Sequence, residues 1–328
     1  MANGLKYNPL QAQLLEFPRL QVEPYRENLL QFAHLYFTIL QEQKIDVTPY
    51  MDLFSTYFSA IDLQLVQPYR FESYHQRLRE PLDYTNFGLD MFRPLVDTTH
   101  SELRGTETLD WIQERLAQKE NVFLMGNHQI EAEPQVLRLM LESRYADIAK
   151  DWIFVAGERV ITDPLAVPFS LGCNLFCIYS KKYFESRAAQ KEVMISHNRS
   201  TIQAIKHQLD AGGKCIYVAP SGGRDRYNAE GHLLPAPFDQ RSVDLMTLLG
   251  KRSRSKTHYC PLALYTYPIL PPPADVRTAI GEERIAHKAP IYVHFGTPLP
   301  LETYSPQIRT NLLYTSVKKY YTAFPIEA

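Results

Sequence analysis

The sequence predicts an α/β protein with a mainly parallel sheet flanked by helices on both faces and preceded by a small helical bundle. Three features support this prediction. Residues 1–80 show helical periodicity, whereas short apolar runs alternate with amphipathic stretches after residue 105. Such alternation is typical of parallel strands joined by helices. The chain has 328 residues, 45% hydrophobic and 22% charged, enough for a large core.

The N-terminal region is expected to form a helical bundle at residues 1–80, ahead of an α/β domain at residues 81–328. Residues 23–43 have a long amphipathic pattern. Thr48 is predicted to cap the next helix, with Pro49 as its first helical residue. We expect a further short helix at residues 69–78. Residues 81–105 show no clean periodicity and are predicted to connect the two parts.

The α/β region contains short apolar runs separated by helical patterns. Thr108 is predicted to cap a helix that precedes the first strand. The predicted strands are residues 122–125, 153–156, 175–179, 216–219, 259–264 and 292–295. The predicted helices are residues 134–145, 188–210, 239–250 and 308–324. Residues 268–273 are Pro-rich and are expected to form a loop, because Pro cannot donate a hydrogen bond within a central strand.

Composition excludes several classes of protein. The net charge of −1 argues against general nucleic-acid binding, which normally requires a basic excess. No apolar run is long enough to cross a bilayer. The amino terminus lacks the pattern of a secretory signal or a transit peptide. Cys173, Cys177, Cys215 and Cys260 lie in apolar surroundings and are expected to be reduced core thiols.

The first candidate site follows the predicted strand at residues 122–125. His128 lies in the turn between this strand and a helix opened by Pro134, at the edge of the sheet where α/β proteins bind ligands. Glu133 follows five residues later, and a turn could bring its carboxylate to a ring nitrogen of His128. A carboxylate that fixes the tautomer of a histidine makes it a good general base. Residues 128 and 133 are therefore candidate catalytic residues, although such a pair is more often structural.

A second candidate site follows the predicted strand at residues 216–219. Gly222 and Gly223 allow close approach of a ligand or a positive φ angle. Arg224 and Arg226 offer planar guanidinium groups suited to a phosphate or a carboxylate. Ser221 lies in a Pro-Ser-Gly-Gly sequence, which differs from the nucleophile elbow of hydrolases. We therefore expect its hydroxyl to shape the loop.

These two stretches resemble the soluble, plastid-type glycerol-3-phosphate acyltransferases. NHQIEAEP (127–134) is similar to the family's His-x4-Asp block, and APSGGRDR (219–226) is similar to its phosphate-binding block. The resemblance continues through AGERVITDPL (156–165), YSKKY (179–183) and CPLALY (260–265), and covers most of residues 85–300.

The resemblance implies transfer of a fatty acyl group from an acyl-carrier protein or coenzyme A thioester to the sn-1 hydroxyl of glycerol 3-phosphate. The thioester is already activated, so we expect neither a covalent acyl-enzyme nor a metal or other cofactor. Two alternatives stay open: sn-2 acylation of lysophosphatidate, and non-catalytic binding of phospholipid or acyl-carrier protein. We expect a cytoplasmic bacterial member or a mature plastid stromal form, without a transmembrane segment, whose product could leave through peripheral contact with a membrane.

Glycerol 3-phosphate carries about two negative charges, so its site should be cationic. The resemblance implies Arg224, Arg226 and Lys182 as phosphate ligands, with Tyr183 where the plant enzymes commonly have His. It also implies Asp where this chain has Glu133, which is one methylene longer.

A dense basic run, Lys251, Arg252, Arg254 and Lys256, could attract an acidic acyl-carrier protein to the acyl entrance, with Lys181 and Arg187 alongside it. A charge run of this kind is more often a solvated loop, so the docking role is a hypothesis.

Overall fold

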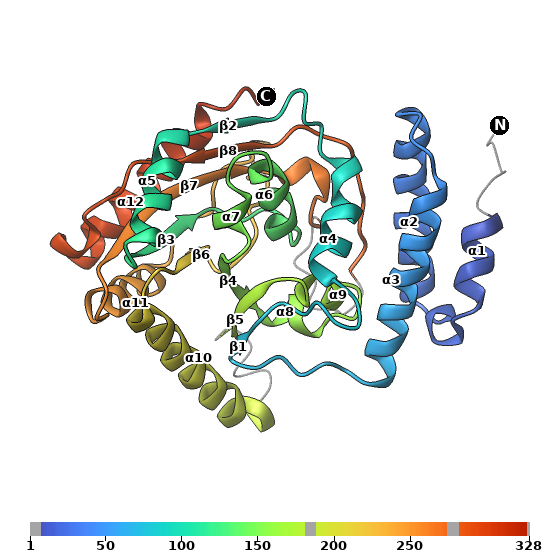
Figure 1. The fold of residues 1–328 in the computed structure, drawn as a ribbon, viewed down its shortest axis with the longest axis horizontal. Helices are drawn as coiled ribbons and strands as arrows, with labels where there is room; N and C mark the ends of the chain where they lie inside the picture. The colour runs from blue at the N-terminus through green and yellow to red at the C-terminus, as the bar shows by residue number, and fades with distance from the viewer. Residues whose placement is uncertain (1–7, 181–187, 274–281, 327–328) are drawn as a thin grey trace.

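The computed structural model describes residues 8–180, 188–273 and 282–326. These residues contain one eight-stranded sheet in the order β1-β5-β4-β6-β3-β7-β8-β2 (Figure 1). The strands are β1 Tyr74–His75, β2 Glu102–Arg104, β3 Asn121–Gly126, β4 Ile153–Gly157, β5 Asn174–Ile178, β6 Cys215–Val218, β7 Thr257–Tyr265 and β8 Tyr292–Phe295. Only the pairs β1–β5 and β7–β8 are antiparallel. The prediction of a mainly parallel sheet is confirmed.

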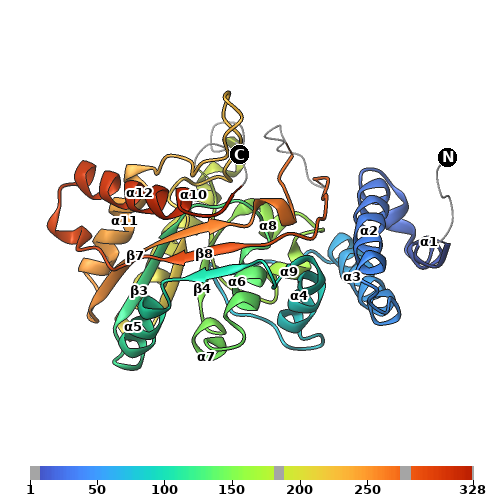
Figure 2. The same cartoon turned by 90° about the horizontal axis from the view of Figure 1, so that it is seen from above.

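Helices cover both faces of the sheet, as predicted. Figure 2 shows α10, α11 and α12 on one side, with α5, α6 and α7 on the other. The bounds in this region are α5 Thr106–Ala117, α6 Glu133–Leu141, α7 Ala146–Ala149, α8 Glu158–Thr162, α9 Val167–Ser170, α10 Lys191–Ala211, α11 Gln240–Lys251 and α12 Pro306–Thr322. Short 3-10 helices are Ala188–Gln190, Tyr267–Ile269 and Leu301–Thr303.

Strand β3 is central because it pairs in parallel with β6 on one side and β7 on the other. All of its residues are buried. Val122 and Leu124 pack in the hydrophobic core on one face of the sheet. Phe123 and Met125 pack in the core on the opposite face. Burial on both faces explains why this strand has a continuous apolar sequence.

The N-terminal helices stand at one end of the molecule (Figure 1). They are α1 Asn8–Leu15, α2 Tyr25–Glu42 and α3 Thr48–Val66, with a 3-10 turn at Pro18–Gln21. Tyr57 of α3 donates a hydrogen bond of 2.8 Å to the carbonyl of Leu165, and its ring lies 5.2 Å from that of Phe169. These helices therefore pack onto the α/β region through a shared aromatic core. The domain boundary at residue 80 stays a prediction.

The sequence prediction is wrong between residues 69 and 105. Residues 69–78 contain no helix; Tyr74 and His75 instead form β1 beside β5. Helix α4, Tyr84–Phe92, was not predicted, although Asp83 caps it by accepting hydrogen bonds from the amides of residues 85 and 86. A 3-10 turn, Arg93–Leu95, follows. The two- and three-residue strands β1 and β2 are too short to show a periodicity, and Gly88 weakens the helical pattern of α4.

Two predicted helix starts are also wrong. Helix α5 begins at Thr106 after Gly105, so Thr108 lies inside the helix and is buried. Helix α3 begins at Thr48, one residue before the predicted Pro49, and Val47 is its cap. The Thr48 hydroxyl instead donates to the side chain of Asp46.

Gly126 at the end of β3 and Gly157 at the end of β4 should differ sharply in how far a substitution by alanine destabilises the fold. A β carbon on Gly126 would collide with the Leu262 carbonyl of β7, whereas one on Gly157 would meet no atom within 4 Å. We expect Gly126→Ala to lower the free energy of unfolding by at least about 2 kcal/mol, and Gly157→Ala to change it by less than about 0.5 kcal/mol. Urea unfolding of both variants checks this expectation, and equal losses would contradict the close approach at β3.

Candidate active site

The two candidate stretches meet at one edge of the sheet. Strands β3 and β6 are parallel neighbours, so the turns that follow them lie side by side. The backbone amide of Asp225 donates a hydrogen bond of 2.6 Å to the carbonyl of His128. The loop that carries Arg224 and Arg226 is therefore attached to the turn that carries His128.

The predicted contact between His128 and Glu133 is present. Nδ1 of His128 lies 2.7 Å from Oε2 of Glu133, which is the first residue of α6 and only 2% exposed. The other oxygen, Oε1, accepts the backbone amides of Gln129 at 2.5 Å and Ile130 at 3.3 Å. One carboxylate thus orients both the imidazole and the turn that bears it.

The ring of His128 is held with one nitrogen available. A carboxylate at Nδ1 favours the tautomer with its proton on Nδ1, which leaves the Nε2 lone pair able to accept a proton. The side chain is 29% exposed, and within the described part of the chain Nε2 has no hydrogen-bond partner. The arrangement is that of a general base aimed at a ligand.

Tyr217 of β6 contacts both the turn that carries His128 and the carboxylate of Glu133. Its hydroxyl lies 2.6 Å from the carbonyl of Asn127 and 3.1 Å from Oε2 of Glu133. Burial, reinforced by the neighbouring Glu133, holds the pKa of the Tyr217 hydroxyl well above its ordinary value. The hydroxyl therefore stays protonated and serves as a donor near neutral pH.

Two buried amide side chains attach the same turn to β7. The side-chain nitrogen of Asn127 donates to the carboxylate of Asp225 at 2.7 Å and to the carbonyl of Leu264 at 2.8 Å. The side-chain oxygen of Gln129 accepts the backbone amides of Thr266 at 2.7 Å and Tyr267 at 2.9 Å. The turn is fixed from three directions, by α6, β6 and β7.

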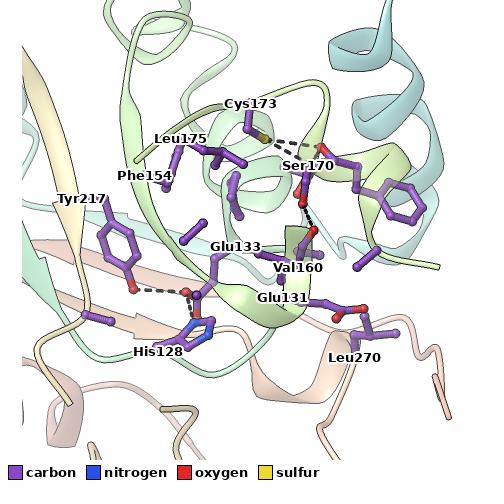
Figure 3. Close-up of a pocket in the computed structure, with 18 of the residues that line it drawn as sticks. His128, Glu131, Glu133, Phe154, Val160, Ser170, Cys173, Leu175, Tyr217 and Leu270 are labelled. Atoms are coloured by element: carbon purple, nitrogen blue, oxygen red, sulfur yellow. Dashed lines mark hydrogen bonds and ion pairs between the residues drawn. The ribbon is translucent and has the colours of Figure 1, made fainter. Parts of the chain in front are cut away.

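A largely apolar pocket opens beside His128, with an internal volume of about 100 Å³. Figure 3 shows His128 and Glu133 on one side of this pocket, with Cys173 and Leu175 on the opposite side. Its other apolar lining includes Phe92, Phe154, Ala156, Val160, Phe169 and Leu270. A candidate base at one side of an apolar pocket suits a ligand with a reactive head group and a hydrocarbon tail.

The two predicted arginines lie in the loop after β6, but one already has a carboxylate partner. Nη2 of Arg224 donates to both carboxylate oxygens of Glu282, at 2.8 and 2.9 Å. Arg159 contacts the same carboxylate. Nη1 of Arg226 donates to the backbone carbonyls of residues 224 and 225, and its buried Nε has no partner among the described residues. Arg226 is thus the freer cation.

The pKa of Arg226 is lowered by burial, with the nearby Arg224 acting in the same direction. An anion bound at this loop would offset both effects. Lys182 and Tyr183 lie outside the described residues, as do Lys181 and Arg187, so the structure gives no position for these four predicted contacts.

The loop itself has the conformation expected of its glycines. Gly222 has a φ of 65°, in the left-handed region that glycine adopts most readily. The hydroxyl of Ser221 donates a hydrogen bond of 2.9 Å to the carbonyl of Gly223. This contact is consistent with the expectation that the Ser221 hydroxyl shapes the loop.

Several residues of the site were not predicted. Nε of Arg284 lies 2.5 Å from Oε1 of Glu131, and its Nη2 lies 3.3 Å from Asp163. Burial alone would raise the pKa of Glu131, but Arg284 and Arg224 lower it, so the group is a carboxylate near neutral pH. Its Oε2 is buried without a partner among the described residues and lies beside the pocket.

The sequence offered a signal for Glu131 only, because it lies three residues after His128 in the same turn. Glu282 and Arg284 belong to a stretch without a recognisable motif. Asn127 and Tyr217 could be recognised as parts of the site only after the register of the strands was known.

The basic run lies at the opposite edge of the sheet. The amide of Asn121, where β3 begins, donates to the carbonyl of Lys256 at 2.7 Å, whereas His128 follows the end of β3. Six strand residues at about 3.3 Å each separate the two edges by on the order of 20 Å. Lys251, Arg252, Arg254 and Lys256 therefore do not lie beside His128, and their place relative to an acyl entrance stays a prediction. Docking of a carrier protein on this run stays a prediction.

Comparison with known proteins adds independent information. Residues 110–268 match the family model described as Acyltransferase. The chain is 43% identical over 224 residues to a chloroplastic glycerol-3-phosphate acyltransferase of Cucurbita moschata, covering 68% of this chain and 50% of the relative. It is 40% identical over 232 residues to the chloroplastic glycerol-3-phosphate acyltransferase of Arabidopsis thaliana, covering 70% and 50%. Residues 110–268 thus match an acyltransferase domain, and the chain is similar over about two thirds of its length to these chloroplastic enzymes.

The chain spans about half the length of the curated relatives it matches. The matched region, residues 110–268, includes His128, Glu133, Arg224 and Arg226 of the acyltransferase domain. None of the helices that the structure describes is both long enough and apolar enough to cross a membrane.

The buried carboxyl of Asp225 makes the stability of this acyltransferase domain depend on pH. Burial raises the pKa of Asp225 to about 6, although the amide of Ala236 and the side chain of Asn127 donate to it. A pKa that is higher folded than unfolded means that the group contributes stability below about pH 4 and loses it as the pH rises through about 6.

We expect the wild type to lose about 2 kcal/mol of unfolding free energy, relative to Asp225→Asn, between about pH 4 and pH 7. Urea unfolding of both proteins at the two pH values measures this double difference. Parallel pH dependences would show that Asp225 is not the group responsible.

Proposed function

We propose that the protein transfers a fatty acyl chain from a thioester to the sn-1 hydroxyl of glycerol 3-phosphate, giving 1-acyl-glycerol 3-phosphate. The observation that supports this most strongly is the oriented pair His128–Glu133 at the mouth of an apolar pocket, beside a loop that carries two arginines. The relatives, named glycerol-3-phosphate acyltransferases, support the choice of acceptor.

In the proposed reaction, Nε2 of His128 takes the proton of the acceptor hydroxyl as its oxygen attacks the thioester carbonyl. The tetrahedral intermediate then expels the thiolate, and the imidazolium returns its proton to the sulfur. Glu133 stabilises the imidazolium through the 2.7 Å contact with Nδ1. The thioester is already activated, so we propose that neither a covalent acyl-enzyme nor a cofactor is needed.

The acceptor is proposed to bind with its phosphate at the loop of Arg224 and Arg226. Glu282 holds Arg224 by one nitrogen, so the remaining donors of that guanidinium can face a ligand. The three-carbon backbone of the acceptor then directs its terminal hydroxyl toward His128. The thioester is proposed to come from an acyl-carrier protein or coenzyme A, in a bacterial cytoplasm or a plastid stroma.

Label transfer from a long-chain acyl-carrier protein to glycerol 3-phosphate tests the proposal. We expect turnover by the wild type and a loss of about 10²–10⁴-fold in His128→Ala, because the base is removed. No turnover by either protein, with glycerol 3-phosphate still bound, would instead support a non-catalytic binding protein.

The same assay separates an orienting carboxylate from a merely polar contact. We expect Glu133→Asp to retain most activity and Glu133→Gln to lose at least about 100-fold, since an amide nitrogen would face either Nδ1–H or the backbone amide of Gln129. Equal activity in the two variants would contradict the role of Glu133.

A further inference from the structure

We refer to the pocket end lined by Cys173, Phe92 and Phe169 as the closed end, because these residues are at most 9% exposed, whereas the side chain of His128 is 29% exposed. By strand register, Leu124, Tyr217, Phe154 and Leu175 form one row across four neighbouring strands. His128 follows this row by four residues, whereas Cys173 precedes it by two. At about 3.3 Å per strand residue, these six positions correspond to on the order of 20 Å along the strand direction. Figure 3 shows them on opposite sides of the pocket.

Two phenylalanines from different helices meet at this closed end. The rings of Phe92 in α4 and Phe169 in α9 lie 5.3 Å apart, and both line the pocket. The carbonyl of Phe169 accepts a hydrogen bond of 3.1 Å from Gln135 of α6 and a 3.5 Å contact from the thiol of Cys173. The end of the pocket is therefore held by main-chain contacts as well as by packing.

The N-terminal helices support this wall from behind. The ring of Tyr57 in α3 lies 5.2 Å from that of Phe169, and its hydroxyl is bonded to the carbonyl of Leu165 just before α9. Phe32 of α2 also reaches the pocket lining. Removal of side-chain volume at the wall would leave space that the surrounding helices fill only in part.

We propose that Phe92 and Phe169 form the end stop of the acyl pocket and set the longest acyl chain that the protein accepts. This inference rests on the proposed function, because it identifies the tail of the ligand as a straight hydrocarbon chain with its thioester at His128. An acyl chain that ends before Phe92 and Phe169 leaves part of the apolar pocket empty. A longer acyl chain collides with the two rings. Each buried methylene contributes roughly a fourfold gain in affinity, so a stop of this kind discriminates sharply by length.

Helix α4 supplies a matched pair of variants. Phe87 and Phe92 are both buried, and their rings lie 5.4 and 5.3 Å from that of Phe169. Only Phe92 lines the pocket. Phe92→Ala should extend the pocket, whereas Phe87→Ala should remove similar packing without extending it. Cys173→Leu gives the reciprocal change, because a larger side chain at the closed end shortens the pocket.

The experiment measures acyl transfer with a series of saturated acyl-carrier thioesters, and in parallel the binding of the matching free fatty acids. We expect Phe92→Ala to shift both preferences to longer chains, with about a tenfold gain for a chain two methylenes longer than the wild-type optimum. Phe87→Ala should keep the wild-type order, and Cys173→Leu should favour shorter chains. Thermal unfolding of each variant confirms that it is folded.

The two readouts separate the inference from the function on which it rests. Transfer with an unchanged length preference in folded Phe92→Ala and Cys173→Leu would overturn the end stop and leave the proposed function intact. A shift in fatty-acid binding without transfer by any protein would support the end stop and overturn the proposed function. An equal shift in Phe87→Ala would show a general loosening of α4 and would also overturn the end stop.

Discussion

The site depends on the carboxylate of Glu133, because it accepts hydrogen bonds from the His128 ring, the Tyr217 hydroxyl and two backbone amides, which no neutral side chain could accept together. It lies at the start of α6, where helix geometry leaves backbone amides without partners inside the helix and favours negative charge. From there one oxygen orients His128 while the other holds the turn through the amides of Gln129 and Ile130. The ring position is thus tied to the end of β3 and the beginning of α6, which are both parts of the buried core.

The second constraint is the parallel pairing of β3 and β6. It brings the loop of Arg224 and Arg226 against the turn of His128, and Asn127 joins both to the end of β7. Charge in this region is nearly balanced by buried partners, with Glu282 between two arginines and Arg284 between Glu131 and Asp163. Removing one member of such a network leaves an uncompensated buried charge, so these residues support the site even where they touch no ligand.

Much of this arrangement could be predicted from the sequence, and the reasons for the failures are physical. Strands buried on both faces have continuous apolar sequences, which made β3, β4, β6 and β7 visible. The contact between His128 and Glu133 followed from a turn that enters a helix at Pro134. The ion pairs of Glu282 and Arg284 depend on segments that approach only in the folded chain, so no local pattern reveals them. The place of the basic run was available in principle, since Lys256 precedes a parallel strand whereas the site residues follow theirs.

The most direct test of the account is a crystal structure with glycerol 3-phosphate bound. We expect its phosphate oxygens within hydrogen-bond distance of Arg226 and Arg224, and its terminal hydroxyl within about 3.2 Å of Nε2 of His128. A phosphate held away from this loop, or a hydroxyl that cannot reach His128 even through one water molecule, would contradict the proposed roles of both stretches.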